Sequence, residues 1–155
     1  MELSVFVKQI EQQRKEQDAI YHRAAVNYGL SDTAMWILYE ISGAEDGYTQ
    51  QELCQQCFFP KQTVNTAVKH LLQDGLLAFR AVPESRNKKK MDLTDKGRAL
   101  ARATTDRLRS AEFRAYRALT EKELGSYLEI MTKLTAFLQK EIEAGQEHRH
   151  GEESV

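Results

Sequence analysis

The sequence predicts a mainly α-helical fold with one small β-hairpin. Apolar residues recur at three- and four-residue spacing in six segments, which together cover most of the 155 residues. Only residues 76–82, with a partner strand around Met91 and Leu93, have the composition of strands. Hydrophobic residues make up 41% and charged residues 29% of the chain, a balance typical of a globular protein rather than a disordered one.

Composition disfavours several classes of protein. No apolar run is long enough to span a bilayer, and the N-terminus lacks a basic region followed by a long apolar stretch, so a cytoplasmic protein without a membrane partner is expected. Two cysteines can form at most one disulfide, too few to stabilise a fold of this length by disulfide bonds. We recognise no Ser–His–Asp arrangement, phosphate-binding glycine loop or metal-ligand spacing, so neither an enzyme nor a metal or other cofactor is expected.

Capping signals set the ends of the predicted helices. Ser31 and Thr94 carry hydroxyl groups that accept hydrogen bonds from first-turn N–H groups. The capping-box spacing occurs twice, at residues 49–52 and 120–123, where a threonine precedes a glutamate by three positions. The predicted helices span about residues 3–28, 32–42, 50–58, 61–73, 95–118 and 121–143, and residues 146–155 are predicted to be a disordered tail.

The predicted helix 61–73 has one apolar and one polar face. Its apolar positions follow helical spacing: Val64, Ala67, Val68, Leu71 and Leu72. The opposite face holds no carboxylate and consists of Gln62, Asn65, Thr66, Lys69 and Gln73. Any surface helix needs a polar face, so solvation alone is one interpretation. The other interpretation is a helix that reads the major groove of DNA. The side chains on this face favour it, because amides pair with adenine, a threonine methyl contacts thymine, and a lysine binds guanine or phosphate.

The segments on either side of this helix strengthen that interpretation. A short helix precedes it across the turn at residues 58–60, which gives the order of a helix-turn-helix, and a hairpin follows it as a wing. Residues 60–90 hold seven lysines and arginines against two carboxylates, a local charge of +5 in a chain of net charge -1. We expect Thr63 to contact phosphate, Arg86 to enter the minor groove, and the neighbouring lysines to contact phosphates, chiefly Lys88 and Lys89.

The order of these elements resembles the MarR family of bacterial winged helix-turn-helix regulators. Residues 64–66, 71–77, 84–86, 93–97 and 119–124 carry the resemblance, which extends over about residues 3–143. It includes the family patterns "L-x-x-x-G-L" after the recognition helix and "L-T-x-x-G" after the wing. Glu84 stands where the family usually has an aspartate that orients the wing arginine.

The resemblance implies a homodimer on a pseudo-palindromic operator in double-stranded DNA. Residues 1–30 and 98–145 would form the helical dimerisation region, and residues 31–97 the winged helix-turn-helix DNA-binding domain. An apolar stripe in the last helix independently favours dimerisation, because it is too long for a small winged core to cover: Leu124, Leu128, Met131, Leu134, Leu138 and Ile142. Packing of these helices within one chain is the alternative.

The expected function is therefore a dimeric, sequence-specific transcriptional regulator, a repressor, relieved by a small-molecule effector. In the family such a pocket lies between the dimerisation helices and the winged domain, where Tyr21, Trp36 and Tyr39 are candidates for its lining or else ordinary packing residues. Cys54 and Cys57 form a C-x-x-C and are either small buried thiols or a redox sensor. The alternatives are thus a thiol-based redox protein and a helical adaptor of the same fold that does not bind DNA.

Overall fold

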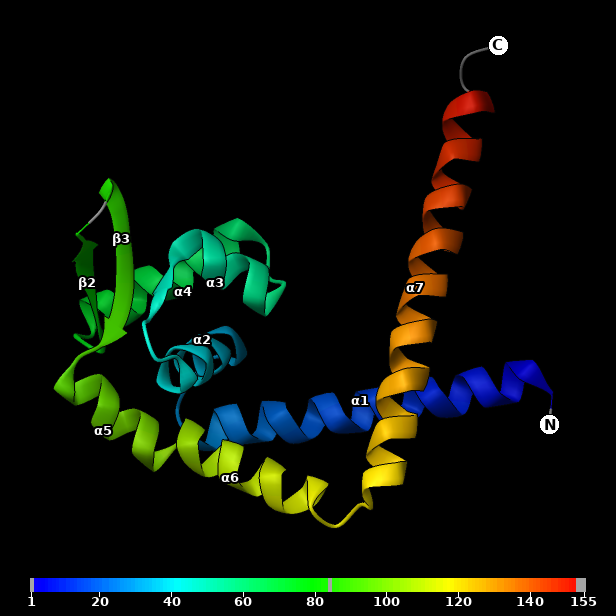
Figure 1. The fold of residues 1–155 in the computed structure, drawn as a ribbon, viewed down its shortest axis with the longest axis horizontal. Coiled ribbons are helices and arrows are strands. Elements are labelled where there is room, and N and C mark those ends of the chain that lie inside the picture. Colours follow the sequence, from blue (N-terminus) through cyan, green and yellow to red (C-terminus); the bar gives the residue numbers. More distant parts are fainter. Residues whose placement is uncertain (1, 84, 153–155) are drawn as a thin grey trace. The chain divides into compact units, whose positions relative to one another are not determined.

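The computed structural model describes residues 2–83 and 85–152, except for the side chains of residues 85–87 and 146–152. The elements are α1 (Leu3–Asn27), α2 (Asp32–Gly43), β1 (Tyr48–Thr49), α3 (Gln50–Cys57), α4 (Lys61–Gln73), β2 (Leu77–Val82), β3 (Ser85–Leu93), α5 (Asp95–Ala103), α6 (Thr105–Tyr116) and α7 (Glu121–Glu152) (Figure 1). The predicted fold class, mainly α with a small β-hairpin, is confirmed. The chain divides into two compact units, residues 1–110 and 111–155.

The capping residues fold as their sequence pattern predicts. The Ser31 hydroxyl accepts from the Ala34 amide at 3.2 Å and begins α2. Thr49 and Glu52 bond reciprocally: the Thr49 amide donates to the Glu52 carboxylate at 2.8 Å, and the Glu52 amide donates to the Thr49 hydroxyl at 3.2 Å. These side chains satisfy backbone donors that have no partner in the first turn of a helix.

Two predicted helices have different limits in the structure. The single helix predicted over residues 95–118 is divided at Thr104, whose φ of -129° and ψ of -86° are not helical. The Thr104 hydroxyl donates to the Leu100 carbonyl at 2.7 Å, one of the local side-chain bonds that compete with regular helix. Beyond the predicted end near residue 143, α7 continues to Glu152, into the segment 146–155 expected to be disordered, because Gly145 alone does not stop the helix.

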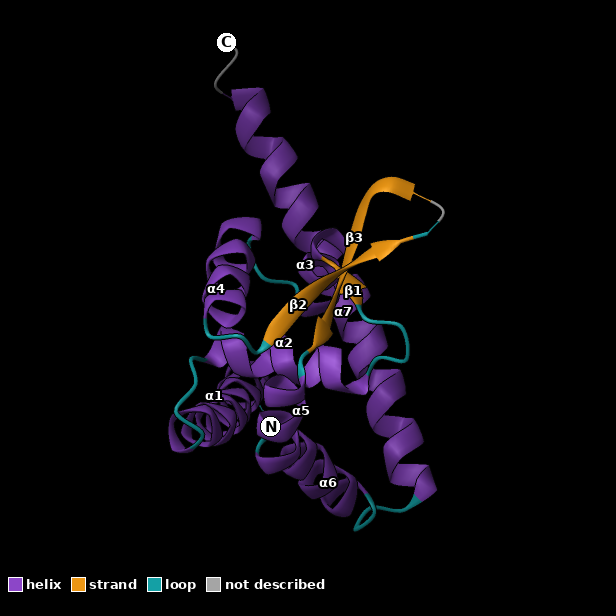
Figure 2. Ribbon diagram, turned by 90° about the vertical axis from the view of Figure 1, so that its left-hand side faces the viewer, coloured by secondary structure: helices purple, strands orange, loops and turns teal. Residues whose placement is uncertain are grey.

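The hairpin is longer than its composition predicts. Polar residues 83–90 were expected to form a loop, but β3 begins at Ser85 and pairs antiparallel with β2, with Phe79 opposite Met91 and Ala81 opposite Lys89. The two-residue β1, too short to give a periodic signal, adds to the other edge of β3 and places Thr49 opposite Lys90. Figure 2 shows β2 and β3 as a projecting ribbon, with β1 beside β3.

The core of the first unit joins the helix-turn-helix to the wing. Fully buried side chains from α2, α3, α4 and β3 form one cluster around Ile37, Leu38, Leu53, Val64 and Met91. A second, smaller cluster holds Ala25, Met35 and Leu108, with aromatic residues of α1 and α2 packed against it. The helix α4 and the wing therefore share one core.

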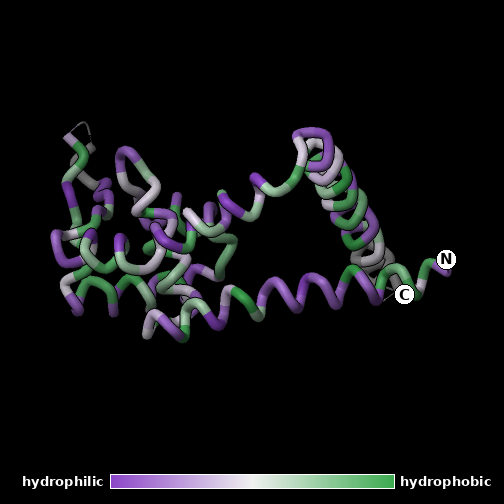
Figure 3. Tube along the Cα trace, turned by 90° about the horizontal axis from the view of Figure 1, so that it is seen from below, coloured by the Kyte–Doolittle hydropathy of each residue, from purple (hydrophilic) through white to green (hydrophobic). Residues whose placement is uncertain are grey.

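The second unit is dominated by α7, whose apolar side chains are largely exposed in this single chain. The predicted stripe is present, with Leu128 exposed by 68% and Ile142 by 58%. Figure 3 shows the alternation of hydrophobic and hydrophilic residues along α7 taken by itself. Within the described residues, no helix combines the length and the apolarity that a bilayer span requires.

The glycine of the "L-T-x-x-G" pattern, Gly97, has a packing role that a mutation can test. A Cβ at this buried position would lie 2.0 Å from the Leu76 carbonyl oxygen, so Gly97→Ala forces α5 away from the start of β2. We expect the free energy of unfolding, measured in urea, to fall by about 1–3 kcal/mol. Arg102→Ala, at an exposed position of the same helix, should stay within about 0.5 kcal/mol of the wild type. Equal stabilities for the two variants would contradict this role.

Candidate nucleic-acid interface

The polar face of α4 points to solvent over its whole length. Val64, Ala67, Val68 and Leu71 are buried in the core of the first unit, which fixes the rotation of the helix. The five residues of α4 predicted to contact DNA are consequently exposed: Gln62, Thr63, Asn65, Thr66 and Lys69. The structure brings these five residues together on one helix, with no carboxylate between Lys61 and Gln73.

Two side chains on this face have hydrogen-bond partners within the chain. The Thr66 hydroxyl donates to the Gln62 carbonyl at 3.0 Å, so its proton is used inside the helix and its methyl group is the part left for an apolar contact. The Asn65 amide oxygen accepts a hydrogen bond from the amide nitrogen of Gln50 in α3. Sequence reasoning did not identify Gln50, because a partner fifteen residues away leaves no local pattern.

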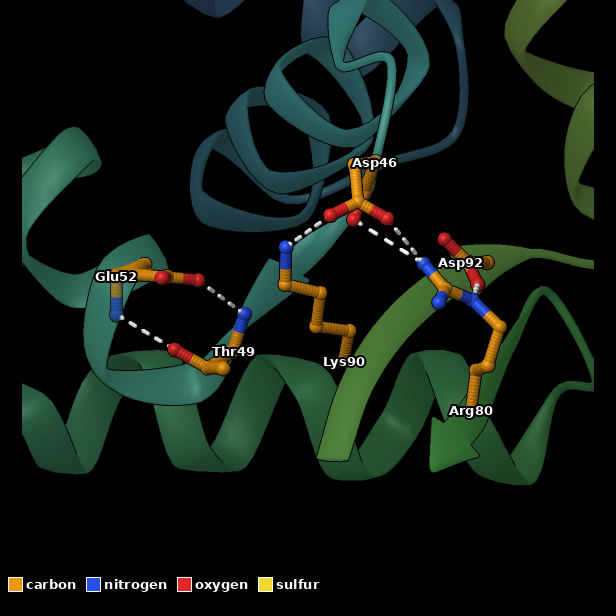
Figure 4. A network of polar contacts seen from close by, with 6 residues as sticks. All are labelled: Asp46, Thr49, Glu52, Arg80, Lys90 and Asp92. Atoms are coloured by element: carbon orange, nitrogen blue, oxygen red, sulfur yellow. Dashed lines mark hydrogen bonds and ion pairs between the residues drawn. The ribbon is translucent and has the colours of Figure 1, made fainter. Parts of the chain in front are cut away.

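Ion pairs divide the cations of the wing into two groups. Arg80 donates to Asp92 at 2.6 Å and to Asp46 at 2.8 Å, and Lys90 donates to the other Asp46 oxygen at 2.5 Å (Figure 4). The hydrogen bonds from Lys90 and Arg80 lower the pKa of Asp46 below its ordinary value. Lys90, counted among the phosphate-binding lysines from the sequence, is therefore held by a carboxylate, and the charge of +5 overstates what the surface offers.

The remaining wing lysines are exposed. Lys88 and Lys89 both lie on β3 and point to opposite faces of the ribbon, since successive side chains on a strand alternate. The Lys89 ammonium group lies 5.9 Å from the centre of the Phe79 ring, a cation–π distance. The side chain of Arg86 and the whole of Glu84 lie outside the described residues, and so does the contact predicted between them.

Shallow grooves lined mostly by residues with polar side chains lie on both sides of α3. One runs between α3 and the wing and is lined by Thr49, Gln50, Gln51, Glu52, Gln55, Phe79, Lys88 and Lys89. Another runs between α3 and α4 and is lined by Gln50, Gln51, Cys54, Gln55, Lys61 and Asn65. Both grooves adjoin residues predicted to contact DNA, so the candidate interface extends from α4 over α3 to the wing.

The aromatic residues predicted as a ligand site form one cluster. The rings of Tyr21 and Trp36 lie 5.0 Å apart, and those of Trp36 and Tyr39 lie 5.4 Å apart. The guanidinium of Arg109 stacks over the Tyr39 ring at 4.1 Å and donates to the Ser42 hydroxyl at 3.2 Å. The three aromatics are half-buried and join α1, α2 and α6 within the first unit.

The two cysteines are free thiols, half-buried against the core. Burial raises the pKa of the Cys57 thiol to about 11, and the nearby carboxylate of Glu40 acts in the same direction. A reactive cysteine needs a lowered pKa, because the thiolate is the nucleophile, so this environment favours the packing role over the redox role. Among the described residues, no group of three or more histidine, cysteine or acidic side chains is placed to hold a metal ion.

The raised pKa of Cys57 predicts a protected thiol. In a Cys54→Ser background at pH 8, Cys57 should react with a small alkylating reagent roughly a hundredfold more slowly in the native protein than in urea. The ordinary pKa of a cysteine thiol is 9.0, so between pH 9.0 and about 11 Cys57 ionises more readily in the unfolded chain than in the native protein. The free energy of unfolding of the wild type should therefore fall relative to that of Cys57→Ser as the pH rises. Equally fast alkylation of native and unfolded protein would show that Cys57 is not protected.

Comparisons with known proteins agree on the fold. The family model described as "MarR family" matches residues 28–86. A MarR family regulator from Neisseria meningitidis is similar in structure, with a TM-score of 0.76 and 19% identity, covering 90% of this chain and 97% of that one. No curated protein sequence matches the chain.

Two of the similar structures contain DNA. The S. aureus MepR–DNA complex has a TM-score of 0.64 and 19% identity, covering 89% of this chain and 99% of that one. A MarR family regulator from Listeria monocytogenes, solved with a 26mer DNA, has a TM-score of 0.65 and 18% identity, covering 87% of this chain and 89% of that one. Residues 28–86 thus match the MarR family model, and over most of its length the chain has the winged helix-turn-helix fold of the similar structures.

Proposed function

We propose that the protein is a dimeric, sequence-specific DNA-binding transcriptional regulator that acts as a repressor. The observation that carries this proposal is the exposed face of α4, which is free of carboxylates and turned outward by the burial of Val64 and its neighbours. A helix of this kind fits the major groove, whose base edges present acceptors, donors and thymine methyl groups. Two similar structures were solved in complex with DNA, which supports DNA binding by this fold.

Each exposed group has a role in this proposal that follows from its chemistry. Gln62, Asn65 and Lys69 would read base edges, Thr66 would contact a thymine methyl through its own methyl group, and Thr63 near the start of α4 would bind phosphate. On the wing, Lys88 and Lys89 would bind phosphates, and Arg86 would enter the minor groove. Arg80 and Lys90 are assigned no direct part, because their charges are already paired with Asp46 and Asp92.

The dimer is proposed from the apolar side chains that this single chain leaves uncovered. Along α7 these include Leu128, Ile130 and Phe137, and at the start of α1 they include Leu3 and Phe6. A stripe of this size on a lone helix is unfavourable in water and marks an interaction site. A second copy of the chain would cover it and place two α4 helices against successive major grooves of an inverted repeat.

Relief by a small-molecule effector is the remaining part of the proposal. The cluster of Tyr21, Trp36 and Tyr39 combines apolar rings with polar tips, the composition of a ligand site, and it joins α1 to α2. A ligand that enters among these rings would favour one spacing of the two α4 helices over another and so shift the population that binds DNA.

DNA binding can be tested by selection and by its salt dependence. Sequences selected from random DNA by the full chain should contain an inverted repeat with half-sites about ten base pairs apart. Removing one bond to a phosphate should reduce the slope of log affinity against log salt by about 0.9, so Lys88→Ala should reduce it by about two in a dimer. Lys133→Ala, which removes an exposed lysine paired with Glu129 in α7, should leave the slope unchanged. Binding that does not respond to salt would contradict the proposal and favour an adaptor without DNA binding.

The dimer makes a separate prediction. In sedimentation equilibrium at micromolar concentration, the wild type should have twice the mass of the chain. Leu128→Glu places a charge in the uncovered stripe and should weaken association by at least about tenfold. Lys140→Glu, at an exposed polar position of the same helix, should remain dimeric. A monomeric wild type at these concentrations would overturn this part of the proposal.

A further inference from the structure

We infer that Gln50 is a specificity-determining residue, which positions Asn65 for reading one base. Gln50 belongs to α3, outside the recognition helix, and its amide nitrogen donates a hydrogen bond to the amide oxygen of Asn65 across the groove between α3 and α4. The inference rests on the proposed function, because it assigns a role within DNA reading. It adds a residue that lies outside the family patterns "L-x-x-x-G-L" and "L-T-x-x-G".

The backbone of Gln50 is fixed by its neighbours. It is the first residue of α3, directly after Thr49, and the capping box of Thr49 and Glu52 holds this turn. Thr49 also pairs with Lys90 of β3, whose ammonium group bonds to Asp46 at 2.5 Å (Figure 4). The backbone that carries the Gln50 amide is thus held beside β3 at the base of the wing. The Gln50 residue is itself half-buried.

In the observed arrangement, this hydrogen bond sets which end of the Asn65 amide faces Gln50. An asparagine amide has one acceptor end and one donor end, and a rotation of 180° exchanges them. Donation from Gln50 to the oxygen occupies one lone pair and holds that end on the side of α3. The second lone pair and both N–H groups stay available, which matches the N6 donor and N7 acceptor of adenine in the major groove. Without Gln50, both orientations are accessible and the preference for adenine weakens.

A purely structural role for Gln50 would have a different effect. Weaker packing between α3 and α4 would lower stability or reduce affinity by the same factor for every DNA sequence. Removal of a positioning bond changes the preference at one base pair of each half-site and leaves the others as they were. The two roles are therefore separated by a specificity profile measured position by position.

The experiment is selection from random DNA with four full-length proteins: the wild type, Gln50→Ala, Asn65→Ala and the double variant. The wild type should prefer adenine about tenfold or more at one position of each half-site, the range of a good bidentate pair. Gln50→Ala and Asn65→Ala should each reduce this preference to under about threefold at that position only, and the double variant should reduce it no further. Gln50→Glu, which keeps the side-chain length but cannot donate, should abolish the preference as well.

Gln56→Ala is the matched control, since Gln56 is an exposed glutamine of the same helix and has no hydrogen bond to α4 among the described residues. It should retain the wild-type profile, and thermal unfolding should show all variants folded. An unchanged profile for Gln50→Ala, or effects of Gln50→Ala and Asn65→Ala that multiply in the double variant, would overturn the inference while leaving DNA binding intact. A wild type that selects no sequence would instead refute the proposed function, and the inference with it.

Discussion

The burial of one face of α4 is the constraint on which the rest of the molecule depends. Val64 is fully buried and Val68 and Leu71 nearly so, in a cluster shared with Ile37 of α2 and Met91 of β3. A helix advances 100° per residue, so fixing these positions also fixes the direction of every side chain between them. The same core holds β3, which means that the recognition helix and the wing cannot rotate independently without breaking it. The polar surface is preorganised by apolar packing.

Ion pairing then determines which cations of that surface stay available to bind phosphate. Exposed ion pairs contribute little to stability, and we assign none to the bonds of Arg80 and Lys90 with Asp46 and Asp92. These ion pairs instead determine where the unpaired positive charge lies. Two cations at the base of the wing are neutralised, while Lys88 and Lys89 further along β3 stay exposed. A chain of net charge -1 can in this way keep a locally positive edge without attracting polyanions over its whole surface.

Sequence reasoning succeeded where the physical cause leaves a capping or periodic pattern in the sequence and failed where it leaves none. The capping residues Ser31 and Thr49 act on backbone groups two or three positions away, so their pattern alone predicted the starts of α2 and α3. Burial of Val64 followed from helical periodicity in the same way. The break at Thr104 and the pairing of β1 depend on a competing local bond and on a strand forty residues distant, and neither gives a periodic signal.

The candidate site shows the same division. The exposed face of α4 was predictable because it is the complement of an apolar face, and the order of helix, turn and hairpin predicted the winged helix-turn-helix fold. The roles of Asp46 and Gln50 were not, since their partners lie from fifteen to forty-four residues away along the chain. Composition counted Lys90 as a surface cation for the same reason: it records which charges a segment holds but not the carboxylates folded against them.

The contacts of Arg109 join α6 directly to α2 within the first unit. Its guanidinium stacks on Tyr39 and donates to the Ser42 hydroxyl and to the Tyr39 carbonyl, near the C-terminus of α2, where a cation also complements the helix dipole. Because α2 packs through Ile37 against α4, a displacement of α6 acts on α4 through two rigid contacts rather than through a loop. If α6 belongs to a dimer interface, the spacing of the two recognition helices is set by the packing of helices, and the aromatic cluster on α2 lies where that packing can be changed.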